Sequence, residues 1–286
     1  MSDAVVGDPE RDVSSGKNKT DENFPVGSLL IARRLRPHVH AYYDFARAVD
    51  DIADNAVLSP EEKVVRLDAM EDVLLGRAPG TERAEMRSAV RLRQSNRDTG
   101  IAPERGTDLL VAFRQDAVKG RYADWEELSE YCRYSANPVG RFLLDLHGEG
   151  ETTHAPSDAL CTALQVLNHL QDLKADRQVL DRCYLPGNWL AQHGETADSV
   201  LRDRCSGGLW AVIERCLDEV DRLNRVAETL PRRIRDRRMR LEAAVIVGLA
   251  RRLARRLRRE DPLAGRVKLT RTDAVGSLLA AARVLP

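Results

Sequence analysis

The sequence predicts an all-α fold. From Phe24 onward, apolar residues recur mostly at helical spacing, the alternation of β-branched residues that marks strands is absent, and Ala, Leu and Arg dominate. No stretch rich in Gly, Pro and Ser divides this part of the chain, so we expect one domain over residues 22–286. Residues 1–21 are polar and charged and are expected to form a disordered leader.

Caps and breakers set the expected helix boundaries. Residues 59–62 combine an N-cap serine, a proline at the first helical position and two acids in the first turn. Asp124, Ser157 and Thr270 are predicted to be similar caps, and Pro138 is predicted to kink a helix or to begin a new one at Asn137. The expected helices are Val26–Asn55 with a break near Pro37, Pro60–Gly76, Arg83–Gln94, Gly106–Lys119, Trp125–Leu146, Ser157–Asp176, Gly208–Leu230, Arg232–Glu260 and Arg271–Arg283.

Composition excludes several classes of function. The formal net charge of +0, from 45 basic and 45 acidic residues, argues against a nucleic-acid binder. Five cysteines without CxxC spacing indicate reduced thiols in the cytoplasm, with neither disulfides nor zinc. The longest apolar run, Ala243 to Ala250, falls short of the roughly 20 residues that span a bilayer, so any membrane contact is expected to be peripheral, at the inner face. GxGxxG, Walker, GxSxG and HExxH motifs are absent.

Two rows of polar residues carry the clearest chemical signal. Tyr43, Arg47, Asp50 and Asp54 are spaced i, i+4, i+7 and i+11, which places them on one stripe of a helix. Taken alone, this stripe has two interpretations: a solvated surface on which Arg47 pairs with an aspartate, or a polar row that faces a cavity.

The second row favours the cavity. Gln165, Asn168, Asp172 and Asp176 also share one face, whereas a solvated row would more usually consist of Lys and Glu. Facing carboxylates repel each other unless cations lie between them, and Mg²⁺ held by a few carboxylates completes its coordination with water and phosphate oxygens. The two rows together predict a Mg²⁺–diphosphate site whose metal ligands are Asp50, Asp54, Asn168, Asp172 and Asp176.

Three other segments remain ambiguous from their residues alone. The small residues between Tyr131 and Gly140 suit either a tunnel wall or tight helix packing. In the loop from Arg182 to Pro186, the arginine is suited to meet a phosphate but equally to lie on the surface. The basic, amphipathic segment Arg232–Arg259 is either a solvated outer helix or a peripheral contact for anionic lipid.

In this order, these residues resemble the squalene/phytoene synthase family of trans-isoprenyl diphosphate enzymes, from roughly Phe24 to the C-terminus. Residues 43–54 and 165–176 correspond to the two aspartate-rich helices of the family, residues 131–140 to its Tyr-Cys…Val-Gly helix, and residues 182–186 to its Arg-x-Tyr-Leu-Pro loop. The resemblance implies an isoprenoid-synthase-type helical bundle with a central apolar cavity, Mg²⁺ as cofactor and a prenyl diphosphate as substrate.

Departures from the family pattern narrow the expected reaction. Residues 22–26 replace a Ser-Phe segment, Gln171 replaces a phosphate-binding arginine, and Val247 stands where an aromatic residue is expected. With residues 135–140, these features are most similar to the branch of bacterial hopanoid biosynthesis that converts presqualene diphosphate and water to hydroxysqualene and diphosphate. Such an enzyme is a Mg²⁺-dependent carbon–oxygen lyase.

The resemblance also implies roles for individual residues. The diphosphate is expected to be bound by Arg47, Gln165, Gln171 and Arg182. The carbocation is expected to be controlled by Tyr43, Tyr131, Asn137 and Tyr184, with Asn137 positioning the water.

Two alternatives remain open. The first is a prenyltransferase that condenses two prenyl diphosphates head to head, giving presqualene diphosphate, phytoene or dehydrosqualene. The second is a non-catalytic helical adaptor, which the complete aspartate pairs disfavour. Expected neighbours in the pathway are a presqualene diphosphate synthase and a squalene-forming oxidoreductase, since no nicotinamide site is evident in this chain.

Overall fold

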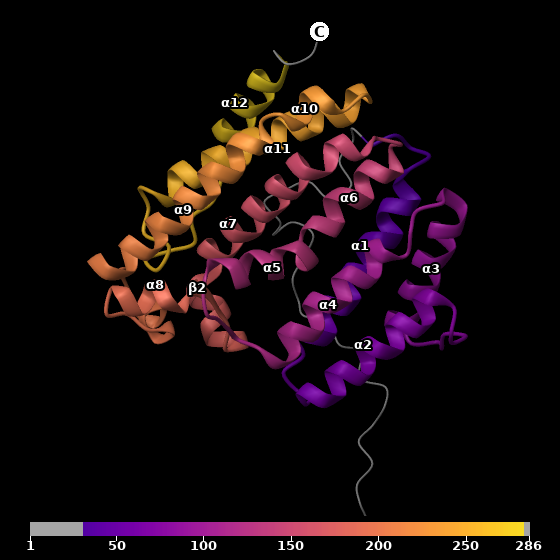
Figure 1. Cartoon of the computed structure of the whole chain (residues 1–286), viewed down its shortest axis with the longest axis horizontal. Coiled ribbons are helices and arrows are strands. Elements are labelled where there is room, and N and C mark those ends of the chain that lie inside the picture. Colours follow the sequence, from indigo (N-terminus) through magenta and orange to yellow (C-terminus); the bar gives the residue numbers. More distant parts are fainter. Residues whose placement is uncertain (1–30, 283–286) are drawn as a thin grey trace, which may run out of the picture.

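The computed structural model describes residues 31–282, so the predicted leader and residues 22–30 lie outside the described part. The all-α prediction is confirmed (Figure 1). The longer helices are α1 (Arg36–Ala53), α2 (Pro60–Leu75), α3 (Ala84–Thr99), α4 (Glu104–Val118), α5 (Trp125–Ser135), α6 (Asn137–Leu146), α7 (His154–Leu180), α9 (Gly207–Ala227), α11 (Arg237–Leu257) and α12 (Arg271–Ala282).

Several short elements were not predicted. They are the helices α8 (Gly187–Gln192) and α10 (Leu230–Arg233), the 3₁₀ turns η1 (Glu151–Thr153) and η2 (Ala197–Leu201), and the strands β1 (Arg121–Tyr122) and β2 (Cys183–Pro186). The two strands pair in parallel and tie the segment after α4 to the segment after α7. Their brevity explains why no alternating pattern marks them in the sequence.

Three of the four predicted caps are confirmed. Ser59 forms a reciprocal capping box with Glu62, and the Asp124 side chain accepts a hydrogen bond from the Glu127 backbone N–H. The Thr270 hydroxyl accepts one from the Asp273 backbone N–H at 3.3 Å. The prediction of Ser157 as a cap was wrong, because α7 begins at His154 and Ser157 is buried within it. A proline in the first helical turn removes an N–H that would have no intrahelical partner, so Pro156 allows this earlier start.

The helices begin or are interrupted at prolines and at capping residues. Ala136 leaves helical geometry with φ −123° and ψ −44°, and α6 begins at Asn137 with Pro138 in its first turn, as predicted. The predicted single helix Arg232–Glu260 was wrong, because Asp236 caps a new helix after α10 has ended. Likewise α1 begins only at Arg36, with Pro37 in its first turn.

The described helices surround two hydrophobic cores. One lies among α1–α4 and includes Phe142 of α6, and the other lies among α5, α7, α9 and α11. In Figure 1, α6 and α7 run side by side where these two groups of helices meet. A Cβ atom on Gly140 would lie 2.5 Å from the Ser157 hydroxyl oxygen, so the glycine lets α6 and α7 approach closely. Within residues 31–282, no helix combines the length and the apolar character needed to cross a bilayer.

Candidate active site

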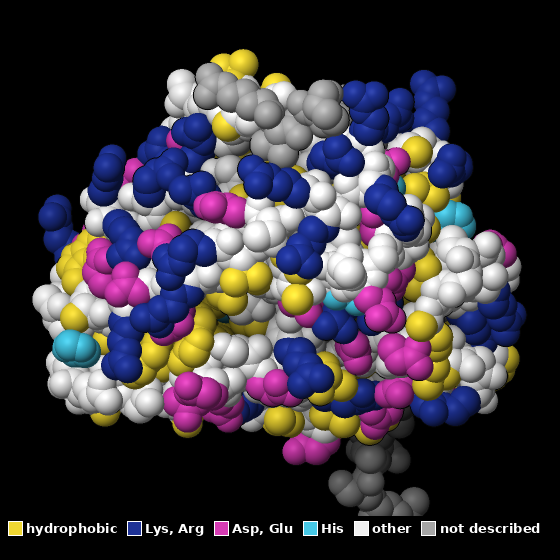
Figure 2. Space-filling view, turned by 45° about the horizontal axis from the view of Figure 1, so that its top comes forward, with side chains coloured by type: hydrophobic (Ala, Val, Ile, Leu, Met, Phe, Trp, Pro, Cys, Tyr) yellow, Lys and Arg dark blue, Asp and Glu magenta, His cyan; other side chains and the backbone are white. Residues whose placement is uncertain are grey.

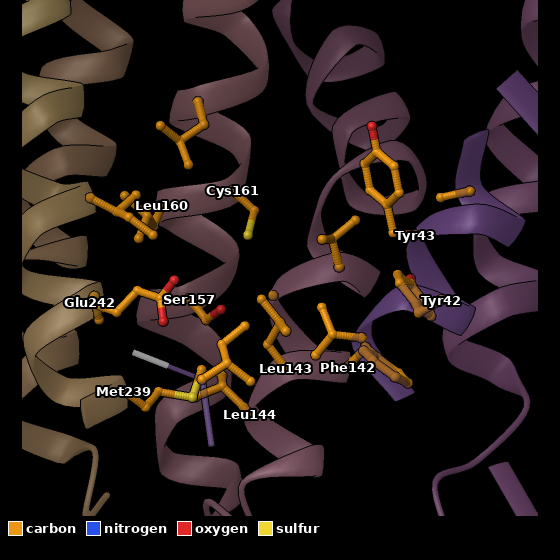
Figure 3. A pocket seen from close by; sticks show the side chains of 18 of the residues that line it. Tyr42, Tyr43, Phe142, Leu143, Leu144, Ser157, Leu160, Cys161, Met239 and Glu242 are labelled. Carbon is orange, nitrogen blue, oxygen red and sulfur yellow. The ribbon is translucent and has the colours of Figure 1, made fainter. Parts of the chain in front are cut away.

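An apolar cavity of about 430 Å³ lies between α1, α6, α7 and α11 (Figure 3). Its wall is formed mainly by hydrocarbon side chains, among them Phe142, Leu160 and Ile246. Polar residues join the lining at Asp50, near the C-terminal end of α1, and at Gln165, in the middle of α7. The cavity therefore combines an apolar interior with charged and amide groups, as a molecule with a long hydrocarbon tail and a polar head requires.

Three of the four members of the first polar row line this cavity. Tyr43, Arg47 and Asp50 all belong to its lining, which decides between the two interpretations of the stripe. The Arg47 guanidinium also pairs with Asp50 at 2.9 Å and with Asp51 at 3.2 Å, so the predicted ion pair is present as well. Asp50 keeps about a quarter of its side chain exposed, which leaves its carboxylate accessible.

The fourth member of this row, Asp54, faces elsewhere. It lies outside the apolar lining and borders a separate polar cleft of about 700 Å³. Its Oδ1 accepts a hydrogen bond from Arg182 Nη1 at 2.6 Å, and both side chains are more than nine-tenths buried. Arg182 Nη2 also donates to the backbone carbonyls of Ala53 at 3.2 Å and Asp116 at 3.0 Å. Arg182, predicted to meet a phosphate, thus joins the ends of α1, α4 and α7.

Asp116, on α4, was missed by the sequence analysis. It accepts hydrogen bonds from the hydroxyls of Tyr131 at 2.7 Å and Tyr184 at 3.4 Å. Burial raises the pKa of Asp116 to about 6, although the Arg182 charge and the Tyr131 hydrogen bond act in the opposite direction. A signal existed in the sequence, because Leu109, Ala112 and Asp116 are spaced i, i+3 and i+7 and place an acid on an apolar face.

The two tyrosines that bond to Asp116 are not among the residues that line the apolar cavity. The Tyr184 ring stacks on His169 with centroids 3.5 Å apart, and burial lowers the pKa of that imidazole to about 3. Asn137 is also outside the lining, and its side-chain oxygen accepts a hydrogen bond from the Thr162 hydroxyl at 3.0 Å. Of the four residues predicted to control the carbocation, only Tyr43 lines the cavity.

The second polar row is joined to the loop between α11 and α12. Arg266 forms a two-pronged pair with Asp172, at 2.8 Å and 3.0 Å, and Gln171 donates a hydrogen bond to the Val267 carbonyl. Asn168 and Asp176 are half-buried. Arg266 was missed because it lies in a loop without periodicity, 94 residues from its partner. Gln171, predicted to bind diphosphate, is directed to the loop backbone.

The oxygen donors of the two rows fit a hard cation. Within residues 31–282, His, Cys, Asp and Glu side chains form no ready cluster of three that could hold a metal ion. The rows nevertheless offer carboxylate and amide oxygens, the donors that Mg²⁺ prefers. Asp50 and Asp172 are about a quarter to a third exposed and pair with arginines that are themselves partly exposed. These two carboxylates are accessible to a ligand, whereas Asp54 is buried and held by Arg182.

Comparison with known proteins identifies the family. A model of the squalene/phytoene synthase family matches residues 17–273. The chain belongs to this family. It is therefore an enzyme that acts on a prenyl diphosphate. It is 43% identical to a hydroxysqualene synthase of Rhodopseudomonas palustris over 90% of this chain and 87% of that protein.

Two further relatives agree with this family. A hydroxysqualene synthase of Zymomonas mobilis is 40% identical, over 94% of this chain and 89% of that protein. The crystal structure of squalene synthase HpnC from Alicyclobacillus acidocaldarius superposes with a TM-score of 0.72 at 31% identity, over 84% of this chain and 90% of that one. The resemblance inferred from the two polar rows is thus confirmed.

Proposed function

We propose that this enzyme is a hydroxysqualene synthase, which converts presqualene diphosphate and water to hydroxysqualene and diphosphate. The observation that carries the proposal is the continuity of the apolar cavity with Arg47, Asp50 and Gln165, because one site then receives both a hydrocarbon and its diphosphate. The similarity to two hydroxysqualene synthases at 40% and 43% identity supports the same reaction.

The first step breaks the carbon–oxygen bond to the diphosphate. Mg²⁺ held by Asp50, Asn168, Asp172 and Asp176 would supply Lewis-acid stabilisation of the leaving group. Asp54, the fifth predicted ligand, would first have to release Arg182. Arg47 is suited to orient the diphosphate because its guanidinium lines the cavity beside Asp50 and can form paired hydrogen bonds to phosphate oxygens. Arg266 has the same capacity beside Asp172.

The second step requires a sheltered carbocation and a single water molecule. The apolar wall excludes bulk water, and aromatic faces such as that of Phe142 stabilise positive charge. Glu242 and Ser157 bring oxygen atoms to the same side of the cavity, opposite Tyr42 and Phe142 (Figure 3). These two side chains are better placed than Asn137 to orient the water. As the new carbon–oxygen bond forms, the Glu242 carboxylate is suited to accept the proton that the water loses.

The test is product analysis by mass spectrometry with purified enzyme, Mg²⁺, presqualene diphosphate and ¹⁸O-labelled water. We expect hydroxysqualene that carries the label, and no product from farnesyl diphosphate alone. Product from farnesyl diphosphate would instead identify a condensing synthase. An inactive wild-type enzyme that also fails to bind a diphosphate analogue with Mg²⁺ would identify an adaptor.

Variants test the metal assignment separately. Asp50→Asn and Asp172→Asn should abolish turnover while the circular dichroism spectrum stays helical. Asp44→Asn is the matched control, because Asp44 lies on α1 outside the cavity lining and pairs with Arg91 at 3.2 Å. Retention of more than a small fraction of activity by Asp50→Asn or Asp172→Asn would refute the assignment.

A further inference from the structure

The C-terminal helix α12 has its apolar and polar sides reversed. Its inward side consists of small and polar residues, with Ser277 and Ala281 almost completely buried. Its three large apolar side chains face outward, where Val275 is 57%, Leu278 51% and Leu279 64% exposed. A helix on the surface of a globular protein normally buries such side chains and exposes polar ones.

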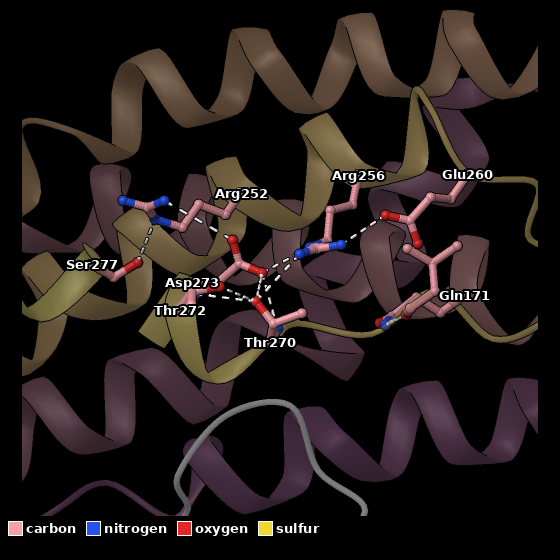
Figure 4. A network of polar contacts seen from close by, with 9 residues as sticks. Gln171, Arg252, Arg256, Glu260, Thr270, Thr272, Asp273 and Ser277 are labelled. Carbon is pink, nitrogen blue, oxygen red and sulfur yellow. Dashed lines mark hydrogen bonds and ion pairs between the residues drawn. The ribbon is translucent and has the colours of Figure 1, made fainter. Parts of the chain in front are cut away.

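Polar contacts hold α12 in this orientation (Figure 4). Arg252 Nε of α11 donates to the Ser277 hydroxyl at 2.9 Å, and Arg256 Nε donates to Asp273 Oδ2 at 2.7 Å. The helices also approach closely, because a Cβ on Gly248 would lie only 3.1 Å from Ser277 Cβ. The outward leucines are therefore a consequence of specific contacts between α11 and α12.

Exposed arginines lie on the neighbouring part of α11, in the turn after it, and at the start of α12. Arg251 and Arg255 are exposed on α11, each one position before a residue that contacts α12, Arg259 is exposed in the turn after α11, and Arg271 begins α12. Within residues 31–282, Arg255, Arg259 and Arg271 form no ion pair. Figure 2 shows Lys and Arg side chains gathered over the upper part of the molecule, where α10, α11 and α12 lie, whereas acidic side chains are more frequent below.

The basic segment Arg232–Arg259 cannot contact lipid as an amphipathic helix in the way that its sequence suggested. The apolar side of α11, including Val247, Leu253 and Leu257, is buried in the core. α11 therefore offers only its arginines to a lipid surface, and the apolar side chains available for insertion belong to α12.

We propose that α12 docks on an anionic lipid surface. Val275, Leu278 and Leu279 enter the boundary between headgroups and acyl chains, and the neighbouring arginines attract the lipid phosphates. A second copy of this chain fits the surface less well, because a two-fold contact would bring the same arginines against each other. Three large side chains also provide far less than the roughly 800 Å² per partner of a standard interface.

Helix α11 contacts both the proposed product cavity and α12. Met239 and Ile246 of α11 line the cavity, while Gly248, Arg252 and Arg256 of the same helix contact α12. A hydrocarbon product formed in the cavity is thus separated from the lipid by α11 and α12.

The experiment is co-sedimentation of the full chain with vesicles of phosphatidylcholine alone and of phosphatidylcholine mixed with phosphatidylglycerol. We expect the wild type to sediment with the anionic vesicles and much less with the neutral ones. Leu278→Glu/Leu279→Glu should reduce binding to the anionic vesicles by about tenfold or more, since it places two anions at the lipid boundary. Arg255→Gln/Arg259→Gln should remove much of the preference for phosphatidylglycerol.

A matched pair of valines provides the control. Val275 is 57% exposed on α12 and Val65 is 66% exposed on α2, so Val275→Glu and Val65→Glu make the same change at similar exposure. Only Val275→Glu should weaken vesicle binding, with the circular dichroism of both variants unchanged.

Three results would refute the proposed docking of α12 on lipid. The first is that the wild type binds neither kind of vesicle, or binds both equally, and the second is that Val65→Glu loses as much vesicle binding as Val275→Glu. The third is that the wild type forms a dimer in sedimentation equilibrium without lipid and that Leu278→Glu/Leu279→Glu dissociates it. Enzyme activity is measured separately with detergent-solubilised presqualene diphosphate, so loss of docking is distinguishable from failure of the proposed reaction.

Discussion

Arg182→Gln should destabilise the protein more than any exposed arginine substitution. Arg182 is only 7% exposed in its side chain and bonds to the Asp54 carboxylate and to two backbone carbonyls. Its removal leaves the carboxylates of Asp54 and Asp116, which are 8% and 3% exposed, without a nearby buried cation. Breaking a buried ion pair by removing one partner typically costs about 3–5 kcal/mol.

The glutamine amide can replace one of the lost hydrogen bonds, so we expect a loss of about 3–4 kcal/mol in the free energy of unfolding. At about 2–4 °C per kcal/mol for a chain of this size, the melting temperature should fall by roughly 10 °C. Urea unfolding followed by circular dichroism measures the first quantity, and a thermal scan measures the second.

Two further variants make this prediction specific. Arg222→Gln removes an exposed arginine that pairs with Glu219 and should cost less than about 0.5 kcal/mol. The double variant Asp116→Asn/Arg182→Gln should lose about 1–2 kcal/mol less free energy of unfolding than the sum of the two single variants. The reason is that only one buried carboxylate, that of Asp54, then remains without the Arg182 cation. A loss below about 1 kcal/mol in Arg182→Gln would refute the inferred role of this cation in joining α1, α4 and α7.

Three other predictions concern pH, packing and product. Burial raises the pKa of Asp116 from 3.8 to about 6, so between these values the native state binds more protons than the unfolded chain and stability falls as pH rises. Asp116→Asn lacks this dependence. As pH rises through that window, the free energy of unfolding of the variant, measured with urea, should therefore increase relative to that of the wild type by up to about 3 kcal/mol. Parallel pH profiles of the two proteins would contradict this prediction. Gly140→Ala should lower the melting temperature because its Cβ would lie 2.5 Å from a side-chain oxygen of α7, at a cost of about 1–3 kcal/mol, whereas Gly150→Ala has open space and should change little. Glu242→Gln should lower the hydroxylated share of products in mass spectrometry while Asn137→Ala leaves it unchanged, and the opposite result would restore Asn137 as the residue that positions water.

The local features of this protein were predictable because they depend on near neighbours in the chain. The row from Tyr43 to Asp54 follows from helical spacing, and the caps at Ser59 and Asp124 follow from side chains that reach the next turn. Where a nearby proline or cap competed, the prediction failed, as at Ser157 and in the segment that Asp236 divides.

Contacts between distant segments could not be predicted in this way. Which carboxylate Arg182 meets depends on how the ends of α1, α4 and α7 pack, and Asp54 lies 128 residues from it in the chain. The contact of Arg266 with Asp172 likewise depends on where the loop after α11 lies.

The sequence by itself determined most of the long helices, the two polar rows and, through them, the family. Only the tertiary structure decided that Tyr131 and Tyr184 bond to a buried aspartate outside the cavity lining, and that α12 turns its leucines outward. The physical reason is that helical periodicity specifies which side chains share a face, whereas the packing of that face against distant segments specifies what the side chains contact.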